Sequence, residues 1–213
     1  MGAAIGTIAG SYKCRLSAHC NEYGFQIYCF EPLSRYFESL KAKFSGDPRV
    51  ICENIALSDA KGFANFFQGE LPFSSSLLPF SNVSEGDAWG EGIFLRTQQV
   101  VSVPAITLDA YCLDNSISHV NILKIDARGG EALILQGCER LMRNQCIDLI
   151  YLEVILEATC QGQPTVWDLM ARMSKFGHEL IDIYDAAKVR GKLMQMDALF
   201  ASAIFTQNHR LPH

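Results

Sequence analysis

The sequence has no apolar run approaching the ~20 residues that a membrane-spanning helix requires, so no span is expected. Basic residues are few: 18 Lys and Arg stand against 23 Asp and Glu, and the net charge of -5 argues against nucleic acid as a partner. No basic leader precedes the apolar stretch 1–10, which therefore lacks the pattern of a signal peptide. The eight cysteines include no CxxC pair and lie mostly in apolar segments. They indicate reduced, buried thiols in a cytoplasmic protein rather than a disulfide framework or a zinc site.

Hydrophobic residues, by contrast, are plentiful. They make up 49% of the chain, against 19% charged residues, which predicts a large buried core and little disorder. Segments of strand type alternate with segments of helix type, and several strands end on an acidic residue. This order predicts an α/β fold: one domain, residues 1–213, built as a three-layer sandwich around a mostly parallel sheet.

The stretch Val120–Glu131 organises the chain. An apolar run of strand length ends at Asp126, two glycines follow, and a helix-like segment runs from Glu131 to Leu141. This pattern is typical of a buried parallel strand, and ligands bind beyond the carboxyl ends of such strands. Asp126 is therefore expected to face a binding crevice. The alternative is that Asp126 or Glu131 caps the helix or interacts with its dipole.

Two segments near the start of the chain suit a nucleotide. Gly2 and Gly6 allow a ligand to approach the backbone closely, although the dinucleotide pattern GxGxxG is not met and close helix packing is the alternative. A strand-like run then ends at Glu31, 25 residues after Gly6, and a ribose-binding acid is expected ~20 residues after such a loop. A carboxylate accepts hydrogen bonds from both ribose hydroxyls. The alternative for Glu31 is a charge in the first turn of the helix that begins at Pro32.

Further along the chain, Asn54 lies at the end of the short strand Arg49–Cys52, where its amide suits either an adenine edge or the support of a turn. A second strand of the organising type ends on the carboxylate of Glu153. The other expected elements are strands at Gly62–Phe67 and Val100–Val103, a break at Pro104, a long loop Gln68–Thr97, helices at Leu108–Leu113 and Thr165–Phe176, and a final antiparallel pair at Leu180–Tyr184 and Leu199–Phe205.

Taken in order, these segments resemble the FkbM family of S-adenosylmethionine-dependent methyltransferases. The pieces that carry the resemblance are Gly2-Ala3-Ala4-Ile5-Gly6, Phe30-Glu31-Pro32, Asn54-Ile55-Ala56-Leu57-Ser58-Asp59, Ser74-Ser75-Ser76-Leu77, Ile106-Thr107-Leu108-Asp109, Leu123-Lys124-Ile125-Asp126-Ala127-Arg128-Gly129-Gly130-Glu131 and Leu152-Glu153.

The resemblance implies a class I methyltransferase fold, with a Rossmann-like sheet whose last strand is antiparallel. It also implies transfer of a methyl group from S-adenosylmethionine to a hydroxyl of a sugar, glycan or secondary metabolite, with no nucleic-acid partner. The residues that it assigns to the cofactor are Gly2, Ala3 and Gly6 beside the methionine part, Glu31 at the ribose, Asn54 near the adenine, and also Ser58 and Asp126. Those assigned to the pocket near the sulfonium and the acceptor are Asp126, Glu131 and Glu153.

Two departures from the family pattern leave an alternative open. Arg128 stands where the family usually carries an acid, and the first strand, which is central in this fold, is absent from the sequence. These features favour a truncated chain or a degenerate, non-catalytic nucleotide-binding protein of the same fold. A nicotinamide dehydrogenase is disfavoured by its glycine spacing.

The candidates for the base that removes the hydroxyl proton are Asp126 and Glu131, followed by Glu153. His119 and His178 are expected to be structural, because one begins a strand and the other lies in a turn between a helix and a strand. No metal is expected, since Asp126 and Glu153 lack an evident third ligand.

Overall fold

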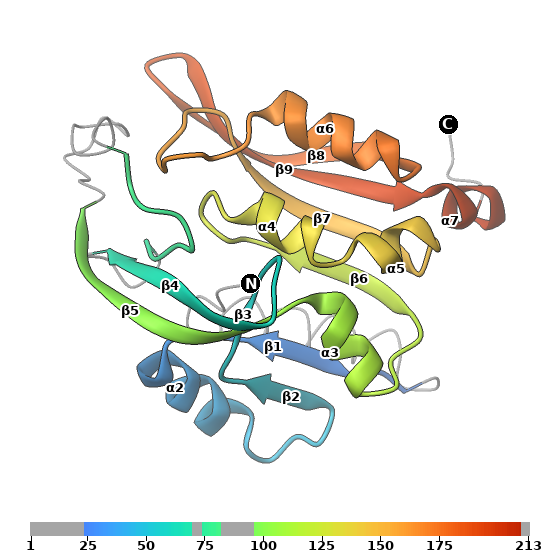
Figure 1. Cartoon of the computed structure of the whole chain (residues 1–213). Coiled ribbons are helices and arrows are strands. Elements are labelled where there is room, and N and C mark those ends of the chain that lie inside the picture. Colours follow the sequence, from blue (N-terminus) through green and yellow to red (C-terminus); the bar gives the residue numbers. More distant parts are fainter. Residues whose placement is uncertain (1–23, 70–73, 82–95, 210–213) are drawn as a thin grey trace.

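The computed structural model of the chain describes residues 24–69, 74–81 and 96–209. The glycines at positions 2 and 6, and Ala3 between them, lie outside this part. The described chain is an α/β protein with mixed sheets (Figure 1). No helix in it is long and apolar enough to cross a membrane.

The first strands form a parallel pair. β1 (Ile27–Phe30) and β2 (Val50–Glu53) are joined by the expected helix, α2 (Ser34–Phe44), which begins two residues after Pro32. Consecutive residues of β1 face opposite sides: Cys29 packs in a cluster with α2, whereas the Phe30 ring meets that of Tyr111 on α3 (Leu108–Asp114) at 4.8 Å. The pair is therefore covered by a helix on each face.

Three strands form a second, mixed sheet. β5 (Thr97–Ile106) lies between β3 (Ala56–Leu57), to which it is parallel, and β4 (Gly62–Gly69), to which it is antiparallel. The expected break at Pro104 is wrong, because β5 continues through it. β3 pairs only with Ala105 and Ile106, so Pro104 lies where one edge of β5 has no partner among the described residues, and a residue without an N–H is tolerated there.

The third sheet has the order β6-β7-β9-β8 (Figure 1). β6 (Val120–Ile125) and β7 (Ile147–Ile155) are parallel, and β9 (Lys192–Ser202) runs antiparallel to both β7 and β8 (His178–Val189). The expected final antiparallel pair is confirmed, and the turn that joins it has positive φ at Arg190 (50°) and Gly191 (83°), which matches a hairpin turn that follows the twist of the strands. The last strand ends earlier than predicted, because the Ser202 side chain accepts a hydrogen bond from Phe205 N and caps α7 (Ala203–Asn208).

The helix expected from Glu131 to Leu141 is two helices, α4 (Glu131–Gln136) and α5 (Glu139–Arg143). The break has a tertiary cause. The carboxylate of Asp109, on α3, accepts hydrogen bonds from Arg140 N (2.8 Å) and Leu141 N (3.0 Å) and so caps α5 from another element. Gly137 at the break lies against the Ser58 carbonyl, with no room for a Cβ.

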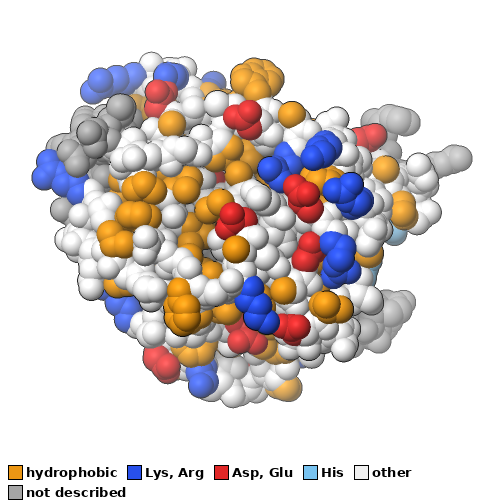
Figure 2. All heavy atoms as spheres, viewed as in Figure 1, with side chains coloured by type: hydrophobic (Ala, Val, Ile, Leu, Met, Phe, Trp, Pro, Cys, Tyr) orange, Lys and Arg blue, Asp and Glu red, His pale blue; other side chains and the backbone are white. Residues whose placement is uncertain are grey.

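α6 (Val166–Lys175) lies with α4 and α5 over one face of the third sheet (Figure 1). Thr165 and Asp168 form a capping box at its start, and Gly177, at φ 69°, follows its end as the sequence predicts. Arg143 on α5 and Arg172 on α6 both pair with Glu139, and Figure 2 shows acidic and basic side chains mixed over this side of the molecule.

The described strands thus form three sheets instead of one continuous, mostly parallel sheet. One main hydrophobic cluster nevertheless crosses between them and includes side chains of β1, β3, β5, β6, β7 and β9. Among the described residues, β1 pairs only with β2 and β6 only with β7, so each keeps one edge without a partner strand.

The long loop expected at Gln68–Thr97 is shorter at both ends, since β4 reaches Gly69 and β5 begins at Thr97. Its described part, residues 74–81, is not a free loop. Ser76 bridges to Phe67, and Phe80 bridges to Cys160, so the segment connects β4 to the chain after β7.

Candidate active site

The turn after β6 is shaped by Glu131. Arg128 (φ 50°) and Gly129 (φ 94°) have left-handed backbone conformations, and Oε1 of Glu131 accepts hydrogen bonds from Ala127 N and Gly129 N, both at 3.1 Å. Burial raises the pKa of Glu131, whose side chain is 2% exposed, while these backbone donors lower it. Glu131 therefore closes the turn that presents Asp126. It does not cap α4, whose N-cap residue is Gly130 and which has no side-chain cap hydrogen bond.

The turn is also held from outside. The carbonyl oxygen of Arg128 accepts hydrogen bonds from Ser76 Oγ at 2.8 Å and from Cys160 Sγ at 3.3 Å. A Cβ on Gly129 would lie 3.1 Å from Oε1 of Gln163, so only a glycine fits without displacing that side chain. Two segments distant in sequence thus fix the Asp126 turn.

Glu153 lies on β7 beside this turn and is 4% exposed. Its Oε1 accepts a hydrogen bond from Gln195 Nε2 at 2.6 Å, whereas its buried Oε2 has no hydrogen-bond partner among the described residues. Burial raises the pKa of Glu153 to about 8; the charge of Asp126 adds to the effect and that of Arg128 opposes it. The Glu153 carboxyl is therefore mostly protonated at neutral pH, and a hydrogen bond to Asp126 contributes to this shift.

Lys124 and Asp197 extend the cluster and were not foreseen from the sequence. Lys124 Nζ is 3.7 Å from Asp126 Oδ2, 3.9 Å from Asp197 Oδ2 and 4.7 Å from the centre of the Tyr151 ring. Burial raises the pKa of Asp197, and Lys124 lowers it. The sequence could have indicated Lys124, because residues two apart on a strand point to the same face and Lys124 is two residues before Asp126. Asp197 could not be found in this way, because only the sheet register shows that it pairs with Glu153 across β7 and β9.

Glu31 and Asn54 form a separate group at the ends of β1 and β2. Burial raises the pKa of Glu31, which is 4% exposed, to about 7, and its Oε1 accepts a hydrogen bond from Leu33 N at 2.9 Å. Asn54 Nδ2 donates to the carbonyl oxygens of Glu31 (2.8 Å) and Pro32 (3.1 Å), and Asn54 Oδ1 accepts from Ser34 Oγ at 3.0 Å. Asn54 therefore supports the turn between β1 and α2, one of its two expected roles.

The structure brings Asp126, Glu131 and Glu153 together: Asp126 raises the pKa of Glu131 and of Glu153, and Glu131 raises that of Glu153. It links Glu31 to Asn54 and not directly to the Asp126 turn. Ser58 is buried, and its hydroxyl donates to Asp59 Oδ1 at 3.0 Å.

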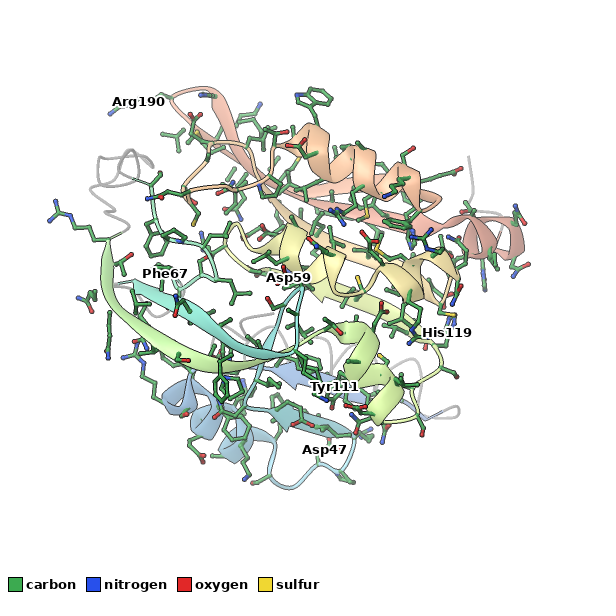
Figure 3. All side chains as sticks on the ribbon, viewed as in Figure 1. Asp47, Asp59, Phe67, Tyr111, His119 and Arg190 are labelled. Carbon is green, nitrogen blue, oxygen red and sulfur yellow. The ribbon has the colours of Figure 1, made fainter. Side chains whose placement is uncertain are left out.

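The two histidines have structural contacts. His119 Nε2 pairs with Asp148 Oδ1 at 2.9 Å at the start of β6, far from the carboxyl end of that strand (Figure 3). The ring nitrogens of His178 lie 3.3 Å and 3.2 Å from the carbonyls of Phe176 and Ile147. In the described ranges, no group of three or more His, Cys, Asp or Glu side chains is arranged to hold a metal ion.

A comparison with protein families identifies residues 1–180 as a methyltransferase FkbM domain. The chain belongs to the FkbM methyltransferase family. The carboxylate cluster of this FkbM domain lies within the matched part, except for Gln195 and Asp197, which β9 adds.

No curated protein matches this FkbM chain. A solved structure described as "A Pericyclic Reaction enzyme" matches it at 11% identity and a TM-score of 0.37, over 93% of the chain and 42% of that protein. The chain spans about two-fifths of that protein's length, and a likeness at this level does not establish a shared fold.

Proposed function

We propose that this protein transfers a methyl group from S-adenosylmethionine to a hydroxyl group of a sugar, glycan or secondary metabolite. The position of the Glu153 carboxyl is the main support for this proposal. Its carboxyl is buried beside Asp126 at the ends of two adjacent parallel strands, with one oxygen lacking a partner among the described residues. A buried polar atom without a partner costs free energy, and a catalytic role is one of the reasons for which native proteins keep such an atom.

The chemistry of the cluster fits a sulfonium cofactor. Four carboxyl groups lie with Lys124 and Arg128 beside the end of β6, and the carboxylate of Asp126 offers a negative charge to a cation. Asp126 and Glu153 would lie toward the sulfonium, and Glu31 is the candidate for the ribose. When bound, S-adenosylmethionine supplies an electrophilic methyl group to an attacking oxygen.

The side chains of the protein would align the acceptor and remove its proton. Reacting atoms must approach to about 3–3.5 Å, and rigid strand ends give the required precision. The pKa of about 8 for Glu153 suits a group that exchanges a proton near neutral pH. Asp126, which is less buried, is the candidate for accepting the hydroxyl proton, and Glu131 keeps the turn in place.

The strand order supports a class I methyltransferase sheet within one domain. The order β6-β7-β9-β8, with β9 antiparallel, matches the second half of such a sheet, and the parallel pair β1-β2 matches its opposite edge. We propose that the edges of β1 and β6 mark the position of the first strand. The free thiols of the six described cysteines support the cytoplasmic setting that we propose.

The alternative is a non-catalytic member of the same fold that binds a nucleotide without turnover. Arg128 favours it, since its charge acts within the carboxylate cluster.

Calorimetry with S-adenosylmethionine, S-adenosylhomocysteine and NAD tests the proposal, followed by incubation of cell extracts with methyl-labelled cofactor. Binding of the first two ligands and labelling of a hydroxyl in a product are expected. Binding without labelling by the wild type supports the non-catalytic alternative. Failure of both S-adenosyl ligands to bind, for this chain and for one extended upstream, refutes cofactor binding.

A further inference from the structure

Two cysteines lie side by side on the parallel strands β1 and β2. Cys29 and Cys52 are direct partners in the strand register and belong to the same apolar cluster beneath α2. Neighbouring strands are about 4.8 Å apart, and the Cα atoms of a disulfide lie about 4.4–6.8 Å apart. The backbone therefore already has the spacing that a bond between these two sulfurs requires.

The two thiols differ in their access to solvent. Cys29 is 3% exposed, whereas Cys52 is half-buried and lines a hollow of about 390 Å³. Lys41 and Asp47 also line this hollow, which lies between the end of α2 and the start of β2; Asp47 is labelled near the foot of the molecule in Figure 3. A small oxidant reaches Cys52 first.

The groups around the two cysteines also indicate that Cys52 reacts before Cys29. Burial raises the pKa of Cys29 to about 12. Burial and the charge of Glu53 raise the pKa of Cys52 as well. Two effects oppose this rise: the S–H of Cys29 donates a hydrogen bond to the Cys52 sulfur, and Lys41 adds a positive charge. Cys52 therefore loses its proton at lower pH than Cys29, and the thiolate is the form that reacts.

We propose that Cys29 and Cys52 form a peroxide-sensitive thiol pair that crosslinks β1 to β2. The Cys52 thiolate attacks a peroxide oxygen, which forms a sulfenic acid and releases water after protonation. The Cys29 sulfur then attacks the Cys52 sulfur, forming the disulfide and releasing a second water. Two thiols lose two electrons, and one hydrogen peroxide is reduced to two waters.

Mass spectrometry of the full chain treated with hydrogen peroxide tests this proposal. Remaining thiols are alkylated before digestion with trypsin, which cuts between the two cysteines at Arg35, Lys41, Lys43 and Arg49. We expect a pair of peptides joined through Cys29 and Cys52, which separates on reduction. Because Cys20 lies in the same tryptic peptide as Cys29, fragmentation of the joined peptides must place the bond at Cys29.

Three variants complete the test. Cys52→Ser and Cys29→Ala are each expected to abolish the joined pair, and Cys146→Ser, which alters a half-buried thiol on another part of the chain, is expected to leave it unchanged. A circular dichroism spectrum and a urea midpoint for each variant show whether it folds. Because Cys52 is only half-buried, Cys52→Ser is expected to fold, and it still tests the proposal if Cys29→Ala does not fold.

The rate of crosslinking is expected to rise steeply, by almost tenfold per pH unit, between about pH 7 and pH 9, as more Cys52 thiolate forms. The groups that face Cys52 are Cys29 on β1, Lys41 on α2 and Asp47 in the turn, and Glu53, on the opposite face of β2, acts on it through its charge. A bond from Cys52 to any other cysteine overturns the proposal. So does over-oxidation of Cys52 without a crosslink, or a joined pair that persists in Cys29→Ala. Cofactor binding has no part in this readout, so the result is independent of the proposed function.

Discussion

Replacing Glu153 by glutamine removes a buried group that titrates, while keeping its shape. The pKa of Glu153 is about 8 in the folded protein, against an ordinary value of 4.5. Above pH 4.5 the unfolded chain releases this proton, whereas the folded chain retains it until about pH 8. Stability contributed by the protonated carboxyl is therefore fully present below pH 4.5 and is lost as the pH rises to 8.

The size of this loss follows from the same two values. Each pH unit in this interval lowers the free energy of unfolding by about 1.4 kcal/mol, which sets an upper bound of about 5 kcal/mol over the whole interval. A glutamine at this position can still accept the hydrogen bond from Gln195 through its side-chain oxygen, and it does not titrate. We therefore expect Glu153→Gln to match the wild type near pH 5 and to exceed its stability by about 2–4 kcal/mol near pH 8.

Urea unfolding followed by circular dichroism at several pH values measures this difference. Glu38→Gln is the control, because Glu38 is exposed on α2. Parallel stability curves for the wild type and Glu153→Gln would refute the burial of a protonated carboxyl at this position. The same variant is expected to bind S-adenosylhomocysteine and to transfer methyl groups at least tenfold more slowly, if Glu153 exchanges a proton in the reaction.

Three further predictions concern the cofactor and the fold. Glu31→Ala is expected to weaken S-adenosylmethionine binding by at least about tenfold in calorimetry, since charged hydrogen bonds contribute about 1.5–3 kcal/mol; an unchanged affinity removes Glu31 from the ribose role. Gly137→Ala is expected to cost about 2–4 kcal/mol in urea unfolding, because its Cβ would meet the Ser58 carbonyl oxygen at 2.0 Å. Gly46→Ala, where a Cβ meets nothing within 4 Å, is its control, and equal effects would contradict the steric explanation. Thr165→Ala is expected to lower stability by about 1 kcal/mol through loss of the α6 cap, and a midpoint within error of the wild type would show that the cap contributes little.

Local patterns predicted the elements well wherever the physical cause is local. The helices predicted at Leu108–Leu113 and Thr165–Phe176 follow from the chemistry of a few adjacent residues, and Thr107 and Thr165 cap them. The family resemblance, identified from motifs in order, is confirmed by the family model, which covers 180 residues.

Errors arose where a distant residue decides the outcome. The break between α4 and α5 depends on the Asp109 carboxylate, 31 residues from Arg140 in sequence. The strand that continues through Pro104 depends on how far β3 extends along β5. No periodicity within either segment carries this information.

The candidate site shows the same division. By itself, the sequence determined which carboxylates end the strands, because an acid after an apolar run is read from adjacent positions. Only the tertiary structure decided that Glu131 closes a turn, that Glu153 is buried beside Asp126, and that Lys124 and Asp197 join the cluster. The burial of a side chain and the charges around it depend on residues that are far apart in the chain. The strand register brings these residues together, and it is set by the packing of the whole sheet.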